Sequence, residues 1–129
     1  MFYLGADNNL EYDIVRNVEQ IKESYQGGCN VIIFIDRSSK YSINSKVFGE
    51  NFSGGRIYRV LKNNDFQLLD KGEVFSEIEG FSENSIDSSN IFVLKKFIEY
   101  CKSNYPSKHY GLIVGSHGGG SRKIDTLLN

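Results

Sequence analysis

The stretch Asn30-Val31-Ile32-Ile33-Phe34-Ile35-Asp36 decides the fold, because its apolar side chains occupy consecutive positions instead of alternating with polar ones. Successive side chains of a strand point to opposite faces of a sheet. A run that is apolar at both parities therefore indicates a strand covered on both faces, as in parallel sheets with helices on either side.

Two amphipathic helices are expected on either side of this strand in the sequence. In the first helix, apolar residues recur at steps of three and four, at Ile14, Val18, Ile21 and Tyr25. Glu11 is among the charged residues on the other faces, and Gly27-Gly28 ends the helix. The second begins at a cap in 86–89 and stops before Pro106. Its apolar stripe, with Phe97 beside it, consists of Ile91, Leu94, Ile98, Cys101 and Tyr105.

The remaining strands complete an α/β pattern. We expect strands at 2–6 and 109–116, a hairpin of strands 56–61 and 66–72, and an exposed loop over 37–55. A helix separates the first strand from 30–36, so these two strands should pair in parallel. The order predicts one unit over 1–129, an α/β sandwich of three layers with a mostly parallel sheet.

Composition excludes several classes of function. The net charge is −1, with 15 basic and 16 acidic residues interspersed, which does not suit a nucleic-acid partner. The longest apolar runs, 31–35 and 112–114, are far shorter than the roughly 20 residues of a membrane span. Two cysteines cannot form a disulfide framework, and no secretory signal precedes the first strand.

The segment His109-Tyr-Gly-Leu-Ile-Val-Gly-Ser-His-Gly-Gly-Gly120 places His117 after an apolar strand. Reactive groups collect at the carboxyl ends of strands in parallel α/β sheets, and an imidazole with a pKa of about 6.5 serves there as general acid or base. The glycines after it remove every Cβ, so backbone N–H groups can approach a substrate carbonyl and stabilise an oxyanion. This pairing suggests acyl transfer.

The chain offers no convincing nucleophile to accompany His117. Cys101 lies on the apolar stripe of a helix, and Cys29 precedes a strand and so belongs to the opposite edge of the sheet. Ser116, as the neighbour of His117 in a strand, should point away from it. His109 begins the same strand and is expected at the surface.

Polar residues after the other strands should share the edge of His117. Asp7 and Asn8 are candidates for contact with substrate, although Asp7-Asn8-Asn9 also suits the cap of a helix. Asp36 ends the second strand and could orient an imidazole, but a dyad works without it, so we assign it no catalytic role.

Three blocks of the chain together resemble the clostripain-like cysteine peptidases. They are Tyr3-Leu-Gly-Ala-Asp-Asn-Asn-Leu-Glu11, the helix end Phe97-Ile-Glu-Tyr100 with Asn104-Tyr-Pro106, and His109-Tyr-Gly-Leu-Ile-Val114 with Ser116-His-Gly-Gly-Gly120. Their order and spacing cover nearly the whole chain.

The resemblance implies a caspase-like fold and a Cys/His dyad. His117 matches the catalytic histidine of the family, and Gly118 matches the glycine whose amide contributes to the oxyanion hole. The cysteine of the family and the acid of its specificity pocket have no counterpart here, which suggests a light chain. A heavy chain of the same precursor, separated by self-cleavage, would supply the cysteine and complete the sheet as a heterodimer.

The resemblance also implies cleavage of peptides after Arg or Lys, and a secreted or periplasmic bacterial protein. This chain itself requires no cofactor and offers no metal site, while calcium is compatible with the family. Two alternatives stay open. An HGGG-type oxyanion loop also occurs in serine esterases and lipases, and a caspase-like pseudoenzyme or binding module could keep His117 without a nucleophile.

Overall fold

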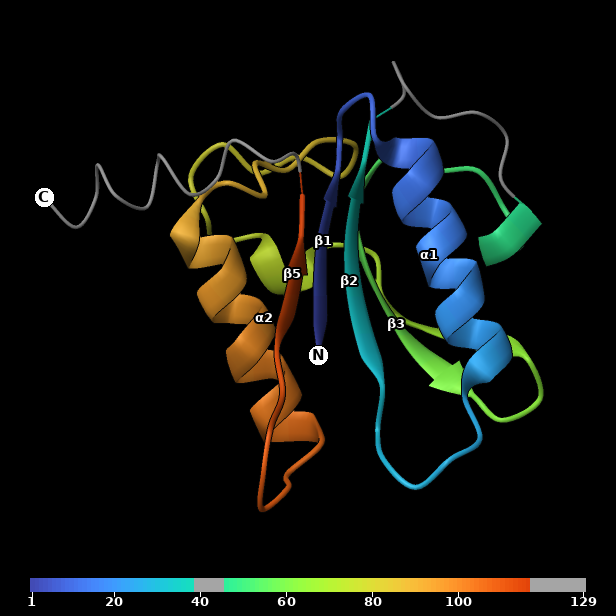
Figure 1. Ribbon diagram of the computed structural model, residues 1–129. Coiled ribbons are helices and arrows are strands. Elements are labelled where there is room, and N and C mark those ends of the chain that lie inside the picture. The colour runs from blue at the N-terminus through green and yellow to red at the C-terminus, as the bar shows by residue number, and fades with distance from the viewer. Residues whose placement is uncertain (39–45, 117–129) are drawn as a thin grey trace, which may run out of the picture.

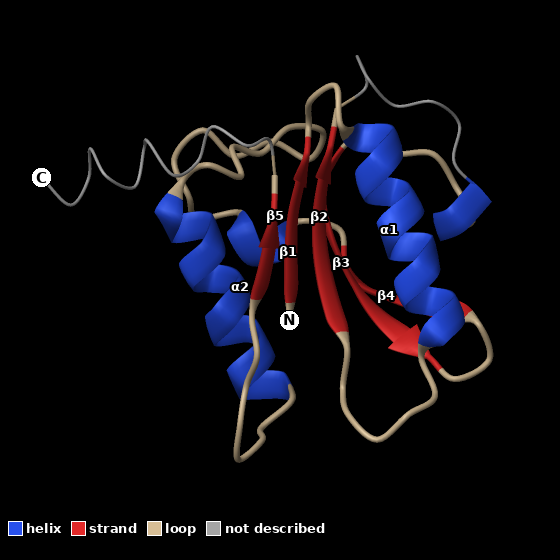
Figure 2. Ribbon diagram, viewed as in Figure 1, coloured by secondary structure: helices blue, strands red, loops and turns tan. Residues whose placement is uncertain are grey.

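The computed structural model describes residues 1–38 and 46–116, which form an α/β sandwich around one five-stranded sheet (Figures 1 and 2). Helix α2 covers one face of the sheet and α1 the other, which confirms the predicted layers. The elements in chain order are β1 (Phe2–Ala6), α1 (Glu11–Ser24), β2 (Ile32–Arg37), η1 (Lys46–Phe48), β3 (Gly54–Leu61), β4 (Asp65–Asp70), η2 (Glu73–Phe75), α2 (Ile91–Asn104) and β5 (Ile113–Gly115).

The sheet is mixed, in the order β4-β3-β2-β1-β5. β1 pairs in parallel with both β2 and β5, as expected for strands separated by helices. β2 and β3, and then β3 and β4, are antiparallel, so the predicted hairpin extends one edge of a parallel centre. β3 is the strand that runs against the other four.

Strand β2 is buried on both faces, as its unbroken apolar run predicts. Ile32 and Phe34 belong to the core beneath α2, and Ile33 and Ile35 belong to the core beneath α1. None of the four side chains is more than 2% exposed. One strand therefore contributes to both hydrophobic cores and joins the two layers of helices.

Aromatic rings fill the core between the sheet and α2. Tyr3 of β1 stacks on Phe34 of β2 with 4.7 Å between ring centroids, and Phe97 of α2 lies 5.8 Å from Phe34. Phe75 of η2 meets Phe34 edge to face at 5.3 Å. Phe34 is thus the ring that connects β1, α2 and η2.

The buried stripe of α2 differs from the predicted one. Val93, Phe97 and Cys101, spaced by four residues, are at most 1% exposed, whereas Ile91 is 68% exposed. The cap also differs, since Asn90 accepts a hydrogen bond from the backbone N–H of Phe92. The helix therefore begins at Ile91, later than a cap in 86–89 requires, and the face that packs on the sheet carries Val93, Phe97 and Cys101.

The predicted exposed loop over 37–55 is wrong at both ends. Arg37 is the last residue of β2 and only 1% exposed, and its Nε donates to Oε1 of Glu11 at 2.5 Å. Glu11, predicted on a polar face of α1, is 3% exposed for the same reason. A buried guanidinium needs a paired carboxylate, and this pair places both side chains between β2 and α1. At the other end, Gly54 and Gly55 already belong to β3.

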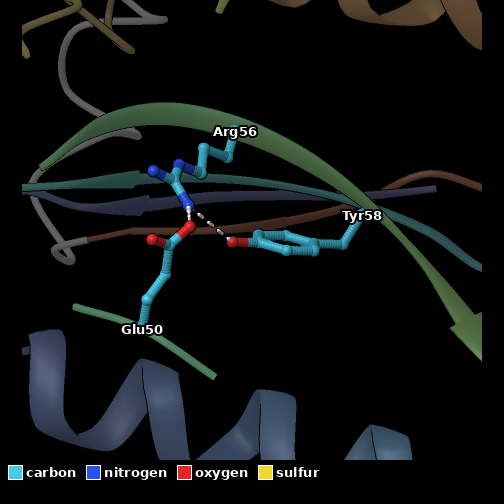
Figure 3. Close-up of polar contacts among 3 residues, drawn as sticks. All are labelled: Glu50, Arg56 and Tyr58. Carbon is cyan, nitrogen blue, oxygen red and sulfur yellow. Dashed lines mark hydrogen bonds and ion pairs between the residues drawn. The ribbon is translucent and has the colours of Figure 1, made fainter. Parts of the chain in front are cut away.

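A second ion pair fixes the segment after η1 onto β3. Figure 3 shows Glu50 and the hydroxyl of Tyr58 converging on Nη1 of Arg56. The guanidinium of Arg56 also lies over the ring of Phe52, 4.2 Å from its centroid. Arg56 holds the pKa of the Glu50 carboxyl below its ordinary value through hydrogen bonding and charge. These contacts lie on the α1 side of the sheet and have a structural role.

Strand β5 is shorter and more exposed than the core strand predicted over 109–116. It spans Ile113–Gly115, with Ile113 56% and Val114 58% exposed. β5 ends the strand order and pairs with β1, so its other edge carries no strand within the described residues. An apolar edge strand of this kind is a surface that a partner can cover.

Replacing Phe97 with Ala should lower the free energy of unfolding by about 3 to 5 kcal/mol, because it removes a fully buried ring from the core. Replacing Ile91 with Ala is the matched control on the same helix and should change it by less than about 0.5 kcal/mol. Urea unfolding followed by circular dichroism measures both. Equal losses in the two variants would contradict the packing described for α2.

Candidate functional site

The carboxyl ends of β1, β2 and β5 meet at one edge of the sheet, which we call the carboxyl edge (Figure 1). Ala6 pairs with Arg37, and Leu4 pairs with Gly115, so the three strands end at nearly the same level. Asp7, Asp36 and Ser116 therefore share this edge, as the sequence predicts. His117 and Gly118, the predicted catalytic and oxyanion-hole residues, lie outside the described residues. The exposed Ser116 directly precedes them.

The two candidates for substrate contact after β1 differ in their surroundings. Asn8 uses its side chain locally, since Nδ2 donates to the Gly5 carbonyl and Oδ1 accepts from the backbone N–H of Leu10, each at 2.9 Å. These bonds close the turn from β1 into α1. Asp7 is exposed at the carboxyl edge. A role of Asp7 or Asn8 in substrate contact stays a prediction.

Asp36 is the buried acid of the carboxyl edge. Its side chain is 2% exposed, and Oδ1 has no hydrogen-bond partner in the described part of the chain. Burial, and to a smaller extent the negative charges of Asp7 and Asp87, raise the pKa of this carboxyl to about 7, against an opposing effect of Ser88. Asp36 therefore changes charge near neutral pH.

Gly5 leaves room for two hydroxyl groups beside Asp36. It pairs with Asp36 across β1 and β2, and a Cβ placed on it would lie 3.1 Å from Oγ of Ser88 and 3.2 Å from Oγ of Ser116. The Tyr3 hydroxyl donates to the Ser88 carbonyl at 2.6 Å and thereby fixes Ser88 above the sheet. The sequence did not predict that Ser88 lies at the carboxyl edge, because a serine shortly before a helix is typical of a helix cap.

Neither cysteine of the chain lies at the carboxyl edge. Cys101 is 1% exposed in the core, and burial raises the pKa of its thiol to about 11. Cys29 is exposed and lines a cleft at the amino end of the parallel strands, together with His109. Both positions agree with the sequence analysis, and His109 is exposed as expected.

Within 1–38 and 46–116, no three His, Cys, Asp or Glu side chains are grouped so that they could hold a metal ion. We therefore derive no step through calcium. Nor does either range contain a helix long and apolar enough to cross a bilayer.

This arrangement of sheet and helices is found in a cysteine protease. A solved structure titled "B. fragilis cysteine protease" matches with a TM-score of 0.53 and 22% identity, over 92% of this chain and 89% of that one, and shows the fold. In sequence, the family model described as "Clostripain family" matches residues 2–126. The chain belongs to the clostripain family.

A curated relative agrees with this membership. Clostripain of Hathewaya histolytica is 43% identical over 132 residues, an alignment that includes the whole of this chain. The chain spans about a quarter of the length of that relative, 25%. The resemblance seen in the sequence blocks is thereby confirmed at the level of family and fold.

Replacing Asp36 with Asn should stabilise the chain at pH 8, because the folded state then no longer buries a charge. The pKa of Asp36 in the folded state, about 7, is above its ordinary value of 3.8. The buried carboxylate therefore lowers the free energy of unfolding by its full amount above pH 7, and this loss shrinks to nothing as the pH falls from 7 towards 4. The gain should be on the order of 4 kcal/mol at pH 8, from 1.36 kcal/mol per pKa unit, and close to zero at pH 4.

Thermal unfolding of wild type and Asp36→Asn at pH 4, 6, 7 and 8 measures this difference. Asp13→Asn, which changes an exposed carboxyl on α1, is the control and should give the same small difference at every pH. A stability gap between wild type and Asp36→Asn that does not vary with pH would contradict the raised pKa.

Proposed function

We propose that this chain is the part of a cysteine endopeptidase that carries the catalytic histidine, His117, and that a companion chain of the same precursor carries the cysteine. One observation carries the proposal. In a chain of the clostripain family, Ser116 lies at the carboxyl edge and precedes His117 and Gly118 in the sequence, and both cysteines lie away from this edge.

In this proposal His117 is the general acid and base of the reaction. Its imidazole takes the proton of the companion's thiol, and the thiolate attacks the carbonyl of the scissile peptide bond. The Gly118 N–H donates to the oxyanion of the tetrahedral intermediate. The imidazolium then gives its proton to the leaving amine, and water activated by the same imidazole hydrolyses the acyl-enzyme.

The exposed edge of β5 supports a companion chain. Leu112, Ile113 and Val114 are 40 to 58% exposed at the edge of the sheet, and the chain spans 25% of the length of clostripain. A strand from the companion would satisfy the free backbone groups of β5 and cover these side chains. We propose that self-cleavage after a basic residue beyond His117, such as Arg122 or Lys123, separates the two chains.

The proposed substrates are proteins or peptides cut after Arg, or after Lys. The described carboxyl edge carries the acids Asp7, Asp36 and Asp87, and a field of this sign favours the approach of a basic peptide. We further propose that the protein is secreted, as the family resemblance implies.

Replacing His117 with Ala should lower kcat/KM by at least about 10³-fold, because the thiol then lacks its base and the leaving amine its acid. The measurement is hydrolysis of an Arg-containing peptide by the chain assembled with its companion. His109→Ala is the matched control, since it removes an exposed imidazole at the other end of the same segment. Turnover that survives in His117→Ala would reject the assigned role.

A double variant, Cys29→Ser with Cys101→Ala, should keep the peptidase activity of the assembly. Neither thiol lies at the carboxyl edge, so neither can attack a carbonyl bound beside His117. An Arg-directed alkylating inhibitor, followed by mass spectrometry of each chain, should label the companion. Label on Cys29, or activity from this chain without a companion, would show instead that the nucleophile lies here.

A further inference from the structure

Helix α2 has a second apolar side besides the one that packs on the sheet. Val93 and Phe97 are buried against the sheet, and an α-helix turns by about 100° per residue. Leu94 and Ile98 each follow one of these buried residues, so they project to one side of the helix, and both are half-buried. Ile91, three positions before Leu94, is on the same side and is 68% exposed. We call Ile91, Leu94 and Ile98 the lateral stripe.

The lateral stripe is turned towards the β5 end of the strand order. Phe92 and Lys96 each precede one of the buried residues Val93 and Phe97, so they project from the opposite side of α2. Nζ of Lys96 lies 3.8 Å from Oε2 of Glu77, which follows β4 and η2 in the chain. That side of α2 therefore faces the β4 end of the sheet, and the lateral stripe faces the β5 end (Figure 2).

Each face of β5 also carries an exposed apolar side chain. Val114 pairs with Tyr3, whose ring belongs to the core beneath α2, so Val114 is on the α2 face of the sheet. Ile113 pairs with Phe2, which packs against the core beneath α1, so Ile113 is on the α1 face. Both side chains of β5 are more than half exposed. The β5 side of the molecule thus presents apolar side chains from the edge strand and from the helix layer.

We propose that the companion chain docks on this whole side as a layered α/β unit, adding a strand to β5 and packing an apolar helix against the lateral stripe. This inference rests on the proposed function. A lone strand would pair with the backbone of β5 but would leave Ile91 and Ile98 in water. The length of the relative is sufficient for a larger unit, because this chain spans 25% of clostripain and the rest of that protein has no counterpart here.

A helix is the element that suits the lateral stripe. The residues of the stripe are spaced by three and four, which is the spacing of the ridges that neighbouring helices pack into each other's grooves. In an α/β sandwich, a further parallel strand needs helices on both faces to bury its side chains. The helix on the α2 side of the added strand would therefore lie beside α2, and its apolar face would meet Ile91, Leu94 and Ile98.

Ile91 and Phe92 form a matched pair for testing this contact. They are adjacent in the first turn of α2 and are 68% and 61% exposed, but they lie on opposite sides of the helix. Only Ile91 belongs to the lateral stripe. In the assembly, the companion should cover position 91 and leave position 92 in solvent.

The first experiment measures alkylation of Ile91→Cys and of Phe92→Cys by iodoacetamide in the assembly of this chain with its companion. Peptide mass spectrometry separates these sites from the other thiols, and native mass spectrometry identifies the chain that is bound. Ile91→Cys should react at least about 10-fold more slowly than Phe92→Cys in the native assembly, because thiol reactivity requires access. In concentrated urea the two rates should agree within about 2-fold.

The second experiment measures association. Ile91→Asp should weaken binding of the companion by at least about 10-fold, because it places a charge in an apolar contact, and Phe92→Asp should weaken it by less than about 2-fold. Both substitutions put an acid in the first turn of α2, where the helix dipole favours it, so neither should unfold the helix. Dissociation on dilution, followed by size-exclusion chromatography, measures both variants.

Equal alkylation at positions 91 and 92, in an assembly that is active and that His117→Ala inactivates, would overturn the helix contact and leave the proposed peptidase intact. Protection of Ile91→Cys by a second copy of this chain, seen in the native mass, would also overturn it. A purified protein without a companion, or wild-type turnover no greater than that of His117→Ala, would instead overturn the proposed function and this inference with it.

Discussion

The burial of β2 on both faces is the constraint on which the rest of the structure depends. Ile32 and Phe34 fill one core while Ile33 and Ile35 fill the other, so α1 and α2 must lie on opposite sides of the same strand. Parallel pairing of β1 with β2 then brings the turn after β1 and the end of β2 to one edge. The carboxyl edge is a consequence of how the two cores are filled.

At the carboxyl edge, Gly5 is important because it has no side chain. Gly5 lies between Asp36 and the end of β5, and hydroxyl groups from two distant segments fill the space above it. An alanine there would place its methyl group 3.1 to 3.2 Å from both oxygens, closer than most real contacts of a Cβ. Gly5 thus lies between the buried acid Asp36 and β5, the strand that precedes His117 in the sequence.

The sequence predicted the order of elements, the parallel centre and the edge shared by Asp7, Asp36 and Ser116, because these follow from apolar periodicity and from the geometry of parallel strands. It did not predict that Glu11 and Arg37 are buried, since a charged residue buries its side chain only when tertiary structure supplies a partner. The stripe of α2 was wrong at Ile91 because the face that packs on the sheet carries Val93, Phe97 and Cys101. The place of Ser88 depends on Tyr3 and Gly5, which no local pattern connects to it.

The successive residues Asp36 and Arg37 point to opposite faces of β2, one without a counter-ion among the described residues and the other paired with Glu11. A shift of β2 by one residue against its neighbours would exchange the two faces. The guanidinium would then enter the aromatic core under α2, and the carboxyl of Asp36 would face the carboxyl of Glu11 with like charge. The adjacent charges of Asp36 and Arg37 therefore disfavour misaligned pairing of β2 during folding. The isoleucines of β2 cannot do this, because they are equally apolar on both faces of the strand.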